Sequence, residues 1–143
     1  HLILTCLIFV LAKGLSIDMG PKPQLFLLMM LVMTLASIFT GSMIAACFSF
    51  SQTLVIGLSI AIPLFLGFLS GLMANSVRDL LVQKAPWALA INPISRASTG
   101  FFVLAAGGPV SLFYRELGAV LIYLAVMLVL TLIGLRRSSY ESL

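Results

Sequence analysis

Long apolar runs separated by short polar breaks dominate the sequence. No Asp, Glu, Lys or Arg occurs from Pro23 to Val77, a stretch of 55 residues. As one straight helix this stretch would be about 80 Å long, whereas the hydrocarbon core of a bilayer is about 30 Å thick. The stretch therefore crosses a membrane twice, and we expect its turn at the polar break of residues 49–53.

The whole pattern predicts an all-α integral membrane protein, a single transmembrane domain of residues 1–143 with four transmembrane helices. A re-entrant or interfacial helical hairpin is expected before the last span, because the apolar residues 99–106 are fewer than the 20 or so that a crossing helix needs. Its arms would descend from Ser76, turn at residues 90–93 and return. The predicted elements are spans at about 2–17, 25–50, 54–74 and 112–135 and a hairpin at about 76–106.

The third predicted span contains a proline and two glycines. Pro63 lacks an amide donor and clashes with the carbonyl of Ser59, which a membrane helix tolerates when neighbouring groups satisfy that carbonyl. Gly67 and Gly71 would lie one turn apart on the face of Ser59 and Pro63, where another helix can approach closely. We therefore expect a kinked span with a packing face. Whether that face serves simple packing or a gating or dimer role stays open, because glycine and proline are common in membrane helices.

Helix caps and breakers define the predicted hairpin. A serine three residues before an aspartate resembles a capping box and predicts the start of a short amphipathic helix. A Pro-Trp pair then ends that helix and places an aromatic side chain where tryptophan is enriched, at the membrane boundary. An Asn-Pro pair predicts the turn between the arms. An inert surface helix pair is the alternative interpretation. The residues concerned are Ser76, Asp79, Pro86, Trp87, Asn92 and Pro93.

Composition supports the membrane class and excludes several functions. The chain is 62% hydrophobic and only 8% charged, with a mean hydropathy of +1.22, far from the soluble average. The eight Lys and Arg residues form no stripe interleaved with aromatics, so no nucleic-acid partner is expected. No phosphate-binding loop, zinc motif or nucleophile motif occurs, so we predict no enzyme, no cofactor and no metal site. Cys6 and Cys47 lie in apolar runs and are expected to be buried free thiols.

The order of these parts resembles the C-terminal part of an ABC-2 type transporter permease, the membrane subunit of a class of ATP-driven ABC exporters. The resemblance extends over essentially the whole chain, although its motifs are loose patterns of Pro, Gly and Ser in an apolar context. The residues that carry it are 51–52 (SQ), 63–71 (PLFLGFLSG), 85–87 (APW), 92–100 (NPISRASTG) and 136–143 (RRSSYESL).

The resemblance implies a C-terminal fragment of a six-span permease, holding its third to sixth spans. The hairpin would be the pair of short helices that dip back into the membrane before the last span. The implied partners are a separate ABC ATPase (nucleotide-binding) subunit, a second permease in a homo- or heterodimer, and the lipid bilayer of a prokaryotic cell membrane. The family's first two spans and interface helix are missing. Residues 72–75 (LMAN) also depart from the family, in which a proline or acidic residue usually follows the Ser-Gly pair found here at 70–71.

Two alternatives stay open at the level of sequence. A non-transporting membrane scaffold or assembly protein would have the same hydrophobic pattern. The orientation in the membrane is also open. The family topology puts the tail with Arg136 and Arg137 in the cytoplasm. The regions 18–23 and 75–115, with five basic residues, would then lie outside, whereas the positive-inside rule favours the reverse.

Overall fold

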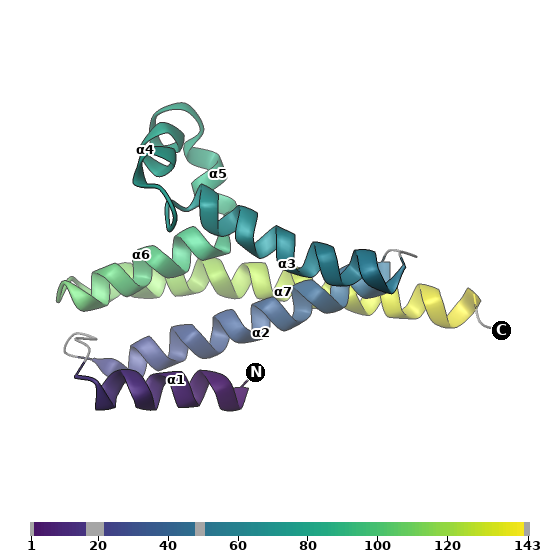
Figure 1. Ribbon diagram of the computed structural model, residues 1–143, viewed down its shortest axis with the longest axis horizontal. Coiled ribbons are helices and arrows are strands. Elements are labelled where there is room, and N and C mark those ends of the chain that lie inside the picture. Colours follow the sequence, from purple (N-terminus) through teal and green to yellow (C-terminus); the bar gives the residue numbers. More distant parts are fainter. Residues whose placement is uncertain (1, 17–21, 48–50, 142–143) are drawn as a thin grey trace.

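The computed structural model describes residues 2–16, 22–47 and 51–141, and all regular structure in these residues is helical (Figure 1). Three helices are long and apolar enough to cross a membrane, at Pro23–Cys47, Gln52–Leu69 and Val110–Arg136. The all-helical class is confirmed, and the chain is a candidate multi-pass membrane protein. The helices are α1 (Leu2–Gly14), α2 (Pro23–Cys47), α3 (Gln52–Leu69), α4 (Asn75–Lys84), α5 (Pro86–Ile91), α6 (Pro93–Ala105) and α7 (Val110–Glu141).

The four predicted spans correspond to α1, α2, α3 and α7, with one difference in length that matters. The 13 residues of α1 make about 20 Å of helix, which is shorter than a crossing requires. The structure therefore supports three span-length helices, and a fourth crossing by residues 2–17 stays a prediction. The predicted loop at 18–23 and turn at 49–53 lie mostly outside the described residues.

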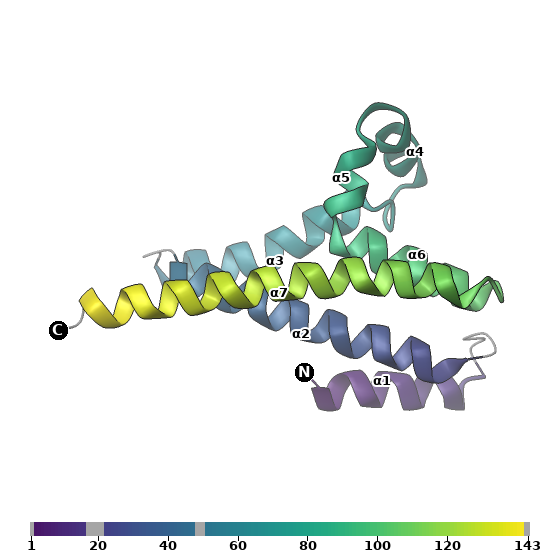
Figure 2. The same cartoon turned by 180° about the vertical axis from the view of Figure 1, so that it is seen from behind.

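Helices α2 and α7 form the centre of the molecule and lie side by side in both views (Figures 1 and 2). The buried residues of α2 recur every three or four positions, so they form one stripe along the helix: Met29, Val32, Ala36, Thr40 and Ile44. Helix α6 covers the first part of α7 and completes the core. The core cluster is Met29 and Val32 from α2, Ala97 and Leu104 from α6, and Phe113, Leu117 and Val120 from α7.

The far ends of α2 and α7 approach closely at a glycine. A Cβ added to Gly134 would lie 2.8 Å from Cys47 Sγ and 2.9 Å from the backbone of Ala46. Hydrogen bonds join the same helices, from the Cys47 thiol to the Leu130 carbonyl at 3.3 Å and from the Thr131 hydroxyl to the Phe39 carbonyl at 3.2 Å. Small residues and polar contacts of this kind hold membrane helices together, because burial against lipid-like surfaces supplies no hydrophobic drive.

The expectation of buried thiols is wrong for both cysteines. Cys6 is exposed because α1 turns Thr5, not Cys6, toward α2. Thr5 shares a 2.8 Å hydrogen bond with Thr34 of α2. Cys47 is also exposed, since it occupies the last position of α2 at the edge of the contact with α7.

The end of α3 corrects the predicted glycine face. The helix stops at Leu69 rather than residue 74, and Gly71 follows it with φ +83°. The N–H of Gly71 donates to the Phe68 carbonyl and the N–H of Leu72 to the Gly67 carbonyl, the two bonds of a Schellman motif. Gly67 and Gly71 therefore share no helix face. Gly71 closes the helix because a left-handed residue is required there.

The predicted hairpin contains three helices instead of two arms. The first, α4, ends at Lys84, and α5 begins at Pro86. Proline is tolerated at the first position of a helix because the N–H group there has no partner within the helix. Both α4 and α5 stand to one side of the bundle, and only α6 packs along α7 (Figures 1 and 2). The predicted capping box is wrong: the N-cap is Ala74, so Ser76 lies inside the first turn, and no side chain caps the helix.

Candidate functional site: a buried ion-pair cluster and an apolar cavity

Asn92 joins the end of α3 to the beginning of α6. Its side-chain oxygen accepts hydrogen bonds from the N–H groups of Ile94 and Ser95, at 3.0 and 3.4 Å, and so caps α6. Its amide nitrogen donates to the Leu66 carbonyl of α3 at 2.8 Å. The side chain is buried, and Pro93 occupies the first turn of α6. The helix break predicted at Asn92 and Pro93 is confirmed, whereas the link to α3 was not visible in the sequence.

Glu116 is a buried carboxylate held between two arginines. Its side chain is 1% exposed, and its Oε2 accepts from Arg96 Nη1 at 2.9 Å. Its Oε1 accepts from Arg115 Nε and Nη2, at 3.1 and 2.8 Å. Arg96 also donates from Nε to the Ala90 carbonyl at 2.9 Å. A buried charge is tolerated when it is paired and hydrogen-bonded in this way. The Arg96–Glu116 ion pair fixes α6 against α7, whereas Arg115 pairs with Glu116 within α7.

The hydrophobic pattern of the sequence assigned no role to Glu116. The available signal was a single acid at the start of an apolar run, with arginines next to it and in the preceding short helix. Such an acid requires a basic partner when it is buried. The choice of Arg96 depended on the position of α6, which hydrophobic periodicity did not provide.

A polar cavity of about 210 Å³ opens beside this cluster, between α4, α5, α6 and α7. A third arginine, Arg78 of α4, lines it and donates from Nη2 to Thr99 Oγ1 at 3.4 Å. The stem of Arg78 packs over Gly71, where an added Cβ would lie 2.7 Å from the Arg78 Cβ. The lining residues are Arg78, Val82, Pro86, Leu89, Ala90, Ser95, Arg96, Thr99, Arg115 and Glu116.

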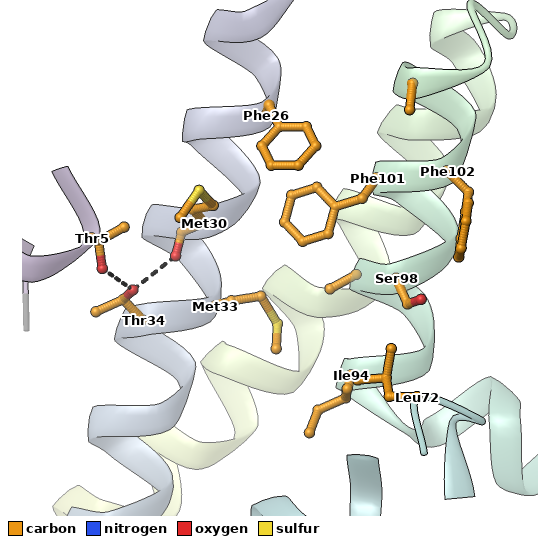
Figure 3. Close-up of a pocket in the computed structure, with 12 residues that line it drawn as sticks. Thr5, Phe26, Met30, Met33, Thr34, Leu72, Ile94, Ser98, Phe101 and Phe102 are labelled. Carbon is orange, nitrogen blue, oxygen red and sulfur yellow. Dashed lines mark hydrogen bonds between the residues drawn. The ribbon is translucent and has the colours of Figure 1, made fainter. Parts of the chain in front are cut away.

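A larger apolar cavity of about 540 Å³ lies on the other side of α6, between that helix and α1 and α2 (Figure 3). The rings of Phe26 and Phe101, which both line it, contact each other with their centroids 4.3 Å apart. Its volume is in the range of small-molecule sites, and its walls suit an apolar ligand or lipid chain. The lining residues are Thr5, Phe26, Met30, Met33, Thr34, Leu72, Ile94, Ala97, Ser98, Phe101, Phe102 and Ala105.

The structure brings together some of the predicted site residues and separates others. Pro63 and Pro93 line one small cavity of about 50 Å³ between α2, α3, α6 and α7. Ser59 faces α2, since its Oγ would lie 3.8 Å from a Cβ on Gly41. A kink at Pro63 stays a prediction. Of the other hairpin residues, Pro86 lines the polar cavity and Asn92 lines neither larger cavity. Ser76, Asp79 and Trp87 are exposed.

Comparison of the chain with known protein families, with curated proteins and with solved structures finds no match. Among the described residues, no group of three or more His, Cys, Asp and Glu side chains is placed to hold a metal ion. The expected absence of a metal or cofactor stays a prediction from the sequence.

Proposed function

We propose that this chain is part of the membrane-spanning permease subunit of an ATP-driven ABC-2 type exporter. The observation that carries the proposal is the position of α6. It is a 13-residue helix, too short to span, that lies along the first part of a span-length α7 and is fixed there by the Arg96–Glu116 ion pair. A short helix returning against the last span is the arrangement that the sequence resemblance implies.

In this proposal α1, α2, α3 and α7 are the third to sixth spans, and α4 to α6 form the re-entrant element before the last one. The apolar cavity between α1, α2 and α6 supplies one wall of the substrate path. Helix α3 buries only Gly67, so its outward apolar side is free to meet the second permease of a dimer. ATP hydrolysis resides in a separate ATPase subunit.

The decisive experiment is reconstitution of the full-length permease with its ATPase. We expect the two to co-purify in mild detergent and the permease to stimulate vanadate-sensitive ATP hydrolysis by the ATPase. An unrelated multi-pass protein in the same detergent is the control. Failure of any nucleotide-binding subunit to associate would contradict the exporter and favour a non-transporting membrane scaffold.

A further inference from the structure

We propose that the polar cavity between α4, α5, α6 and α7 binds a phosphate group, carried by an anionic lipid headgroup or by free phosphate. The site does not depend on the proposed export function, because it follows from the charges and hydrogen bonds of the cavity itself. The name arginine cavity is used below for the space lined by Arg78, Arg96, Arg115 and Glu116 together with the other lining residues given above.

The charges of the arginine cavity do not balance. Three arginines and one glutamate are its charged lining residues, so its formal charge is +2. The single negative charge of Glu116 offsets only one of the three arginines, and Arg96 and Arg115 already share it. A cavity with this excess of positive charge favours an anion.

Many of the arginine N–H groups are free to bind a ligand. Each guanidinium has five donors, and the three arginines together make five hydrogen bonds to the part of the chain that the structure describes. Arg78 makes one of these, at 3.4 Å to Thr99, and is the least occupied. Planar guanidinium groups bind phosphate through pairs of parallel hydrogen bonds, which makes phosphate the anion that suits the site.

The position of the cavity suits a lipid headgroup as one source of that phosphate. Arg115 and Glu116 immediately precede the apolar run of residues 117–135, so the cavity lies at one end of the span-length part of α7. Val82, Pro86 and Leu89 give it an apolar rim next to the charged wall. Basic pockets between helices at this depth bind anionic headgroups.

The test measures phosphate binding by the full 143-residue chain in neutral detergent. The probes are short-chain phosphatidylglycerol, short-chain phosphatidylcholine and inorganic phosphate, and the readouts are lipid retained in native mass spectrometry and the shift in melting temperature. We expect retention of phosphatidylglycerol over phosphatidylcholine. Arg78→Gln should weaken that binding about tenfold, the loss expected for one charge-assisted hydrogen bond.

Lys84→Gln is the matched control, because it removes the same charge from the same helix but Lys84 does not line the arginine cavity. Thr99→Val is a second variant that removes the hydroxyl partner of Arg78 without changing charge. The melting temperature of Thr99→Val without ligand shows whether the hairpin still folds. This variant should reduce the preference for phosphatidylglycerol less than Arg78→Gln does.

The probes distinguish the two sources of phosphate. If inorganic phosphate raises the melting temperature and displaces phosphatidylglycerol, the site takes free phosphate; if only the lipid binds, it takes the headgroup. Either result supports the site. Equal retention of the two lipids without an effect of phosphate, or equal losses in Arg78→Gln and Lys84→Gln, would overturn it.

Discussion

Glu116 shows how one charged residue can fix the packing of two helices in an apolar chain. Its carboxylate is 1% exposed, whereas the side chains of its partners Arg96 and Arg115 are 29% and 67% exposed. The Glu116 carboxylate therefore depends on the two arginines for its hydrogen bonds, whereas the arginines remain partly exposed. Its hydrogen bonds replace the water that burial removes.

We predict that Glu116→Gln lowers the free energy of unfolding by about 3 kcal/mol, because the buried amide nitrogen of glutamine would face an arginine N–H group and leave both donors without an acceptor. Arg115→Gln should cost less, since Arg96 still pairs with the carboxylate and Arg115 is largely solvent-accessible. Thermal unfolding in detergent, followed by the fluorescence of the single tryptophan, Trp87, measures both. A loss at Arg115 as large as that at Glu116 would contradict the assigned asymmetry.

Asn92 has two separable roles, and substitutions can divide them. Asn92→Ala removes both the cap of α6 and the hydrogen bond to Leu66, so we expect a loss of about 2 kcal/mol, the upper end for an N-cap. Asn92→Ser keeps a capping oxygen and removes only the donor to Leu66, so its loss should be smaller, about 1 kcal/mol. Hydrogen exchange at the α6 N-terminus is the second readout. Protection there should fall in the alanine variant alone.

At the scale of elements, the crossing of α2 and α7 depends on the absence of a side chain at Gly134. We predict that Gly134→Ala separates the far ends of these helices, because its Cβ would meet the backbone of Ala46, which cannot move aside as a side chain would. The labelling rate of the Cys47 thiol should rise and the melting temperature should fall.

Gly118→Ala is the matched control on the same helix, since nothing lies within 4 Å of a Cβ added there. Alanine is the better helix former by about 1 kcal/mol, so this variant should be neutral or slightly more stable. Equal destabilisation by the two substitutions would mean that helix propensity, not the close approach to α2, controls the effect.

The sequence predicted helices more reliably than their ends. Uninterrupted apolar runs identified α2, α3 and α7, because a helix of that composition satisfies its backbone in an apolar medium. The Gly67–Gly71 spacing fits both a packing face and a helix terminus, and only the backbone at Gly71 distinguishes them. The break at Ala85 was expected from Pro86, but that a second short helix follows it, and that only α6 returns to the bundle, depends on tertiary contacts.

For the whole molecule, periodicity could not predict the candidate sites. The arginine cavity draws residues from four helices, and the apolar cavity adds Leu72, which follows the end of α3. Chain direction was easier to predict. The start of α2, the end of α3 and the start of α7 lie toward one end of the bundle, and the end of α7 lies toward the other (Figures 1 and 2).

This arrangement predicts that Gln83 of α4 and Ser139, near the end of α7, lie on opposite sides of the membrane. The test introduces Gln83→Cys or Ser139→Cys into a background with Cys6→Ser and Cys47→Ala, because both native thiols are exposed. Under the exporter proposal, a membrane-impermeant maleimide added to intact cells labels residue 83, and residue 139 reacts only after permeabilisation. The reverse pattern would keep the arrangement and follow the positive-inside rule, against the family orientation. Labelling of both from one side would contradict the crossing of the membrane by α7.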